Sequence, residues 1–259
     1  PTSFLIVSLY FIFKRNWVLN SIFVAFAILC KTNFIIVIPF LILYMYKSNH
    51  FNLKKISYSL LIIFFLIVII QFPLLINTPY LSTVYNNETQ AKFLNLFINF
   101  DTTRKTLFYI APSSIILLIF YGSTFKTFNK NLFILFLGFS FATITLLTPP
   151  SQGWYCWFLP MLIYFLIKNS SATSKLFYWI FIGAYFIYFL VFPESDFLNL
   201  TPLSESYSFY QLLPISNQFK DLIVNFSFTF LQITLLTNCI LMLVKGIESY
   251  KQYKFLYQP

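Results

Sequence analysis

Six residues of the sequence have side chains suited to binding a ligand that carries a phosphate group. They are Lys31, Arg104, Lys105, Gln152, Trp154 and Tyr155. The guanidinium of Arg104 is a planar fork that matches paired phosphate oxygens, and Lys31 supplies a compact positive charge. Gln152 both donates and accepts hydrogen bonds. Trp154 and Tyr155 belong to an aromatic cluster of the kind found at membrane–water interfaces.

Each of these residues also has a simpler interpretation. Lys31 can extend its side chain to a membrane interface without binding a ligand. Arg104 and Lys105 can pair with lipid headgroups, and the aromatic cluster can be an ordinary interfacial belt. Both interpretations stay open on the sequence.

Residues that bind metal ions are sparse in this chain. Three cysteines lie in or beside apolar runs without metal-ligand spacing, and His50 is the single histidine. No zinc site is therefore expected, and no cofactor is assigned. Carboxylates in the longer polar segments could bind sugar hydroxyls or a divalent cation, although their spacing indicates no specific metal site. These acids are Glu88, Glu194, Asp196 and Glu205.

The elements that must position these residues are strongly apolar. The chain of 259 residues is 59% hydrophobic and 9% charged, and its mean hydropathy is +0.77. These values exclude an ordinary soluble domain and predict an all-α, polytopic bundle of transmembrane helices, a single membrane-embedded domain over residues 1–259. About seven to nine hydrophobic segments are expected, some short or re-entrant. They are 3–13, 17–30, 33–46, 56–76, 107–123, 131–147, 154–167, 176–192 and 222–244.

Lysine and arginine fall mostly on one side of this arrangement. When the loop after the first segment is placed in the cytoplasm, most of the 17 basic residues lie in short cytoplasmic loops, as the positive-inside rule requires. The basic residues left outside are Lys31, Lys92, Arg104, Lys105 and Lys220. The net charge of +10 thus reflects membrane orientation, and no nucleic-acid partner is expected. The bias toward Ile, Asn, Lys, Phe and Tyr is typical of an AT-rich genome, so we expect a bacterial inner-membrane protein.

Three outer segments carry most of the polar variety, and function is expected there. Two are long connections, residues 77–106 and 193–221. Within the first, AKFLNLFINF (91–100) has apolar spacing that suits a helix lying in the interface plane, and no strand pattern competes with the helices. The third is TPPSQGWYCWFLP (148–160), in which Pro149 and Pro150 end one helix and Gly153 permits a sharp return.

The segment TPPSQGWYCWFLP resembles the late outer loop of GT-C fold glycosyltransferases, which use polyprenyl- or dolichyl-phosphate sugars. In many of these enzymes a proline-containing polar turn leads into an aromatic-rich helix that ends in Leu-Pro near the lipid phosphate. Residues 1–46 are similar to a block of the mannosyltransferase-like members, with basic-Asn-Trp and Cys-Lys steps followed by an apolar run into proline. The matching positions are Lys14, Arg15, Trp17, Lys31 and Pro39.

The resemblance covers residues 1–46 and 107–168. It implies that a sugar moves from a polyprenyl-phosphate donor to an acceptor hydroxyl on the outer face, with Arg104, Lys105 and Lys31 stabilising the departing phosphate. The catalytic base of the family, an acid in the first outer loop, has no counterpart here. Because the sequence begins at Pro1 directly within an apolar run, we expect a preceding part of a longer protein to carry this acid.

Three other functions stay open. An O-antigen or capsule polymerase has a similar composition. Such enzymes usually carry several arginines in their outer loops, whereas Arg104 is the one arginine predicted on the outer side here. A flippase or other transporter of lipid-linked sugars would place charged groups within its spans, where only Lys31 comes near. A non-catalytic subunit of a membrane complex, with a membrane-protein partner, would account for the missing base.

Overall fold

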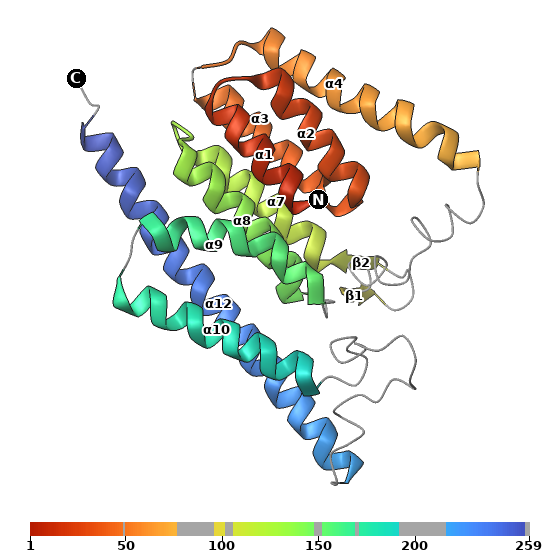
Figure 1. Ribbon diagram of the computed structural model, residues 1–259, viewed down its shortest axis with the longest axis vertical. Coiled ribbons are helices and arrows are strands. Elements are labelled where there is room, and N and C mark those ends of the chain that lie inside the picture. Colours follow the sequence, from red (N-terminus) through yellow and green to blue (C-terminus); the bar gives the residue numbers. More distant parts are fainter. Residues whose placement is uncertain are drawn as a thin grey trace.

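The computed structural model describes residues 1–48, 50–76, 96–101, 106–147, 152–168, 171–191 and 216–256, which form a helical bundle with one small hairpin (Figure 1). The N-terminal elements are α1 (Thr2–Phe13), α2 (Trp17–Cys30), η1 (Thr32–Ile36), α3 (Val37–Lys47), α4 (Leu53–Gln71) and η2 (Phe72–Ile76). They are followed by β1 (Phe97–Asp101), β2 (Thr106–Tyr109), α7 (Ile110–Thr124), α8 (Lys130–Leu147), η3 (Gln152–Trp154), α9 (Tyr155–Lys168), α10 (Ala172–Val191) and α12 (Asn217–Leu256).

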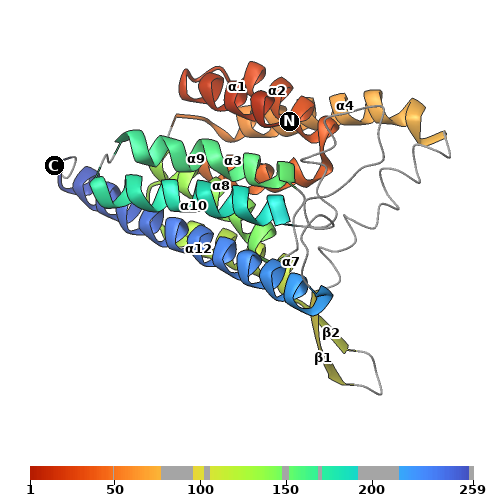
Figure 2. The ribbon, with the colours of Figure 1, turned by 60° about the horizontal axis from the view of Figure 1, so that its bottom comes forward.

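Helix α8 is the centre of the bundle. It packs against α3, α7, α9 and α12, and most of its side chains are buried. The pair α1–α2, covered by α4, lies at one margin, and α10 with α12 lies at the other (Figures 1 and 2). Gly138 lets the central helices approach closely, because a Cβ there would lie 2.9 Å from Met242 Cε and 3.0 Å from Met161 Cβ. Small residues commonly bring membrane helices together in this way.

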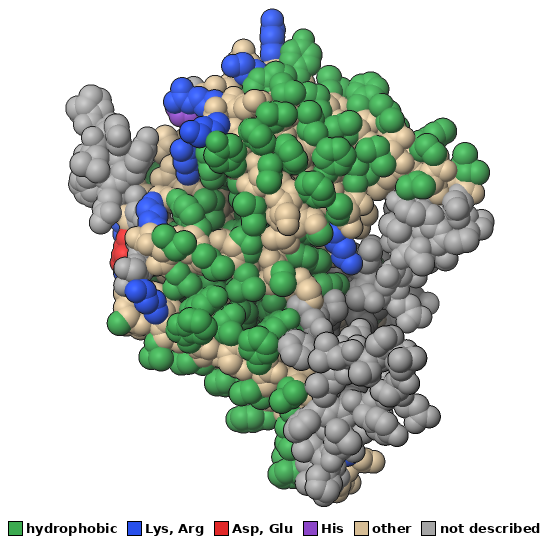
Figure 3. Space-filling view, in the orientation of Figure 1, with side chains coloured by type: hydrophobic (Ala, Val, Ile, Leu, Met, Phe, Trp, Pro, Cys, Tyr) green, Lys and Arg blue, Asp and Glu red, His purple; other side chains and the backbone are tan. Residues whose placement is uncertain are grey.

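The outer surface of the bundle is apolar, as a lipid-facing surface must be. Hydrophobic side chains cover most of the face in Figure 3, and α4 exposes Phe64, Phe65 and Ile69. Patches of this extent are rare on soluble proteins. Four segments of the described chain are long and apolar enough to cross a bilayer: Leu53–Leu74, Lys130–Leu147, Ala172–Val191 and Asn217–Glu248. The helical class is therefore confirmed, with four candidate membrane spans, whereas seven to nine crossings stay a prediction.

The remaining apolar helices have 10 to 17 residues. Helix α2, with 14 residues, is about 21 Å long at 1.5 Å per residue, which is shorter than the roughly 30 Å of a hydrocarbon core. Helix α12, in contrast, is longer than predicted. Its 40 residues begin before and continue beyond the predicted segment 222–244, because neither Lys220 nor Lys245 breaks a helix.

The hairpin corrects the prediction of a helix over 91–100. Residues 97–101 form β1, which pairs antiparallel with β2, and Phe97 lies opposite Tyr109. The predicted fifth span also begins too early, since its residues 107–109 belong to β2 and α7 starts at Ile110. Aromatic and β-branched residues in FINF and TLFY favour extended structure once a partner strand is adjacent. Residues 91–95 lie outside the described part.

The short basic loops converge on one end of the bundle, which we call the basic end. Lys130 Nζ lies 5.3 Å from the ring centroid of Phe13, at the end of α1. Lys47, at the end of α3, donates to the carbonyl of Phe125, which follows α7. Lysine and arginine side chains gather accordingly along one margin of the molecule in Figure 3. The predicted orientation places these loops together in the cytoplasm, and that orientation stays a prediction.

Candidate functional site

The turn after α2 and the start of α9 meet at the end of the bundle opposite the basic end. Phe34 of η1 lies against Trp157 of α9 and Phe141 of α8, with ring centroids 5.5 Å and 4.9 Å away. Trp157 in turn stacks on Trp154, at 5.2 Å and an interplanar angle of 18°. Aromatic rings at these separations attract one another beyond their burial. Residues 31–36 and 154–157 therefore form one packed unit.

Lys31 occupies the turn between α2 and η1. Its backbone is extended (φ −155°, ψ 112°), which ends α2. Its N–H donates to the carbonyl of Ala27 at 3.1 Å, and its own carbonyl accepts from Phe34 N at 3.0 Å. The side chain is half-buried. The predicted span 33–46 is consequently two elements, η1 and α3, and the turn sets Lys31 directly before a groove.

This groove, called the η1 groove, has a volume of about 270 Å³. Thr32 and Asn33 supply its polar wall, whereas isoleucines of η1 and α8 supply its apolar wall. Its lining consists of Thr32, Asn33, Ile35, Ile36 and Ile144. A groove with both polar and apolar walls suits an amphiphilic ligand such as a lipid.

A second groove follows the other flank of α8, where α8 meets α7. Its volume is about 400 Å³, and it is mainly apolar. The residues that line it are Ser114, Leu117, Leu118, Tyr121, Thr143, Leu146 and Leu147. The last two turns of α8 are thus flanked by apolar grooves on two sides.

Trp154 and Tyr155 are buried inside the bundle. Their exposed fractions are 3% and 1%. The ring of Tyr155 packs against Phe181 and Phe189 of α10, and its hydroxyl lies 3.5 Å from the Gln232 amide nitrogen. The same amide donates to the carbonyl of Thr145 at 3.1 Å. These contacts give both rings a packing role inside the bundle, and their predicted part in a ligand site stays a prediction.

The other predicted site residues are placed only in part. Arg104 and Lys105 lie outside the described residues, as do Glu88, Glu194, Asp196 and Glu205. Gln152 begins η3, but its side chain lies outside the description. Within the described ranges, no group of three or more His, Cys, Asp and Glu side chains is close enough together to hold a metal ion.

Sequence reasoning missed both grooves. The Thr32–Asn33 step into Ile35 and Ile36 is the only signal for the η1 groove, and a polar step of that kind also fits an ordinary helix end.

No protein-family model, curated protein or solved structure matches this chain.

Proposed function

We propose that the protein is an integral-membrane glycosyltransferase that receives a polyprenyl-phosphate sugar at the end of the bundle that carries Lys31. One observation carries the proposal: the half-buried Lys31 directly precedes a groove that passes from the polar Thr32 and Asn33 to isoleucine side chains. A polyprenyl phosphate matches this arrangement, because it has a charged head followed by an apolar chain. The resemblance of residues 1–46 and 107–168 to GT-C enzymes supports the same donor.

The phosphate would be held near Lys31. A cation at the boundary of an apolar region attracts a phosphate more strongly than one in bulk water, because the local dielectric constant is lower. The first isoprene units would lie in the η1 groove against Ile35, Ile36 and Ile144, and the rest of the chain would extend into the bilayer. Lateral entry from the membrane would bring the donor to this position.

The remaining chemistry belongs to residues outside the described part. Arg104 and Lys105 would neutralise the phosphate as it departs, since a guanidinium binds two phosphate oxygens at once. Gln152 would contact the polar part of the donor. The carboxylate that activates the acceptor hydroxyl is unassigned.

The packing inside the bundle favours this proposal over a carrier. Buried polar side chains of the spans mostly bond to nearby backbone carbonyls, as Asn20 does to Ser8 O at 3.0 Å and Asn238 to Phe177 O at 3.1 Å. A transport path for a polar cargo needs polar groups that face an internal cavity. Asn20 and Asn238 join neighbouring helices and do not line such a path.

The test measures donor binding and transfer by the full chain in lipid nanodiscs. Undecaprenyl phosphate is titrated, with undecaprenol as the phosphate-free control. A charge-assisted contact contributes about 1.5–3 kcal/mol, so Lys31→Ala should weaken undecaprenyl phosphate binding by about tenfold or more. The matched control is Lys54→Ala, an exposed lysine at the basic end. Release of polyprenyl phosphate from polyprenyl-phosphate mannose and related donors then reports transfer.

Two outcomes would contradict the proposal. Equal binding of undecaprenol and undecaprenyl phosphate would remove the phosphate site. An unchanged affinity in Lys31→Ala, beside an unchanged Lys54→Ala, would remove Lys31 and the η1 groove from donor binding.

A further inference from the structure

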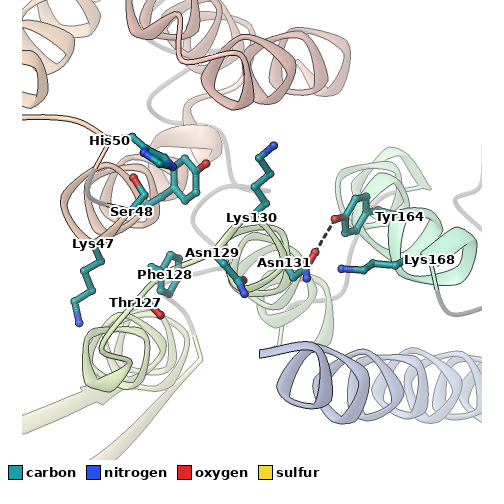
Figure 4. A pocket seen from close by; sticks show the side chains of 11 residues that line it. Lys47, Ser48, His50, Thr127, Phe128, Asn129, Lys130, Asn131, Tyr164 and Lys168 are labelled. Atoms are coloured by element: carbon teal, nitrogen blue, oxygen red, sulfur yellow. Dashed lines mark hydrogen bonds between the residues drawn. The ribbon is translucent and has the colours of Figure 1, made fainter. Parts of the chain in front are cut away.

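The basic end of the bundle contains a cavity of about 470 Å³, which we call the basic cavity (Figure 4). It lies between the end of α3, the link into α8 and the end of α9. Lys47, Lys130, Lys168 and His50 line it, and none of the described residues around it is acidic. A concave surface with charge of one sign concentrates ions of the opposite sign. The cavity therefore selects anions over cations.

The polar wall of the cavity is built by the start of α8. Asn129 accepts a hydrogen bond from Leu132 N at 2.9 Å and so caps the helix. Lys130 and Asn131, the first two residues of α8, both line the cavity. The first backbone N–H groups of a helix lack partners within it, and they add a partial positive charge to that of the lysines.

The three lysines are held differently. Lys47 donates to the carbonyls of Ser123 and Phe125 and is thereby committed to the end of α7. Lys130 lies over the ring of Phe13, 5.3 Å from its centroid. No hydrogen bond joins Lys168 to another described residue, and Figure 4 shows its side chain extended toward Asn131. Of the three, Lys168 is therefore the cation most available to a ligand.

One further contact and the partial burial of Lys168 prepare this position. The hydroxyl of Tyr164 donates to Asn131 Oδ1 at 2.7 Å (Figure 4), which leaves the amide N–H groups of Asn131 for other acceptors. Partial burial lowers the pKa of Lys168, which follows the apolar part of α9. An anion beside Lys168 would stabilise its charged form.

The surroundings of the cavity are those of a membrane surface. Tyr46, directly before Lys47, is 60% exposed, and Ile167, directly before Lys168, is 77% exposed. Apolar side chains that face outward beside lysines match the boundary between acyl chains and headgroups. A lipid can satisfy both environments, whereas a soluble ion satisfies only the cations.

We propose that the basic cavity binds the phosphate of an anionic phospholipid, with Lys168, Lys130 and the start of α8 as its donors. The lipid lies in the leaflet at the basic end, which is the cytoplasmic leaflet in the predicted orientation. This site is separate from the groove at Lys31, which lies at the other end of the bundle, and it does not depend on the proposed transferase activity.

The experiment counts bound lipids on the detergent-solubilised full chain by native mass spectrometry. Phosphatidylglycerol is titrated beside two control lipids. The phosphate of phosphatidylcholine is balanced by the lipid's own cation, and diacylglycerol has no phosphate. One phosphatidylglycerol should bind about tenfold more tightly than either control lipid. Lys168→Gln should lose this preference, while Lys168→Arg should keep it and show that the charge, not the fold, is responsible.

The matched control is Lys175→Gln, which removes the same charge from an exposed position on α10 at the basic end. It should bind phosphatidylglycerol as the unmodified protein does. Equal losses in Lys168→Gln and Lys175→Gln would overturn the site, because general surface charge would then explain the binding. Displacement of the lipid by an equal concentration of glycerol phosphate would overturn the assignment to a lipid.

Discussion

Phe34 and Trp157 lie edge to face, with ring centroids 5.5 Å apart and an interplanar angle of 72°, although they come from opposite halves of the chain. This contact fixes the turn that carries Lys31 against the start of α9. Phe34 is fully buried and also packs against Phe141 of the central helix. The geometry of the η1 groove therefore depends on an aromatic cluster behind it.

Removal of this contact should loosen both turns. Trp157→Ala leaves a cavity beside Phe34 and Phe141, and we expect a loss of about 3 kcal/mol in the free energy of unfolding, since core Trp→Ala changes cost about 3–5 kcal/mol. The measurement is thermal unfolding in detergent. Trp179→Ala is the control, because Trp179 is 66% exposed on α10 and its loss should cost little. Equal melting temperatures in the two variants would show that the aromatic cluster does not hold the turns.

The central helices should not tolerate a side chain at Gly138. The added methyl of Gly138→Ala would lie 3.0 Å from Met161 Cβ, an atom close to the α9 backbone that cannot easily move away. We expect a net destabilisation of about 1 kcal/mol, as overpacking outweighs the gain in helix propensity. Gly183→Ala is the matched change, because nothing lies within 4 Å of its Cβ position. That variant should unfold at a higher temperature, and a rise in both variants would contradict the close packing at Gly138.

Asn238 joins α12 to α10 within the apolar region. Its amide nitrogen donates to the carbonyl of Phe177 at 3.1 Å and to that of Thr234 at 2.9 Å. Asn238→Leu should destabilise the bundle by about 1 kcal/mol, the usual scale for a hydrogen bond between membrane helices. Thr237→Val serves as the control, since Thr237 is only partly buried and its hydroxyl bonds within its own helix, to the carbonyl of Ile233. Chemical unfolding in mixed micelles compares the two variants.

Lys47 ties the end of α3 to the end of α7. Its ammonium donates to two carbonyls there, those of Ser123 and Phe125, so Lys47→Met should free the last turn of α7. Hydrogen exchange of residues 120–126 should become faster, while α9 keeps its protection. Lys54→Met removes an exposed charge nearby, and the same acceleration in that variant would mean that charge alone explains the effect.

Lipid binding at the basic cavity should weaken as pH rises. Burial lowers the pKa of Lys168, so this lysine loses its proton at a lower pH than an exposed lysine does. Only the protonated form attracts phosphate, and the affinity for phosphatidylglycerol should therefore fall through that range. Lys168→Arg should flatten the profile, because arginine stays charged. The other titratable side chains around the cavity are Tyr44, Lys47, His50, Lys130 and Tyr164.

A profile that is unchanged in Lys168→Arg would assign the pH dependence to one of those other groups. Native mass spectrometry at several pH values, with the lipid concentration held constant, provides the comparison.

The helices themselves were largely predictable. The segments 3–13, 17–30 and 131–147 agree with α1, α2 and α8 to within a residue at either end, because long apolar runs bounded by Asn16, Lys31 and Lys130 have few alternatives in a membrane. The hairpin was not predictable in the same way. FINF and TLFY become strands because they pair with each other, and that pairing is not visible in the apolar spacing of either segment.

The sequence by itself determined the apolar helical class, the positions of several helices and the grouping of basic loops on one side, since composition and the distance between charges set them. Only the tertiary structure decided which side chains meet. It buried Trp154 and Tyr155 inside the bundle, and it brought Lys47, Lys130 and Lys168 from the ends of three helices around one cavity. Contacts between distant segments depend on how helices pack across the whole bundle, and no short stretch of sequence carries that information.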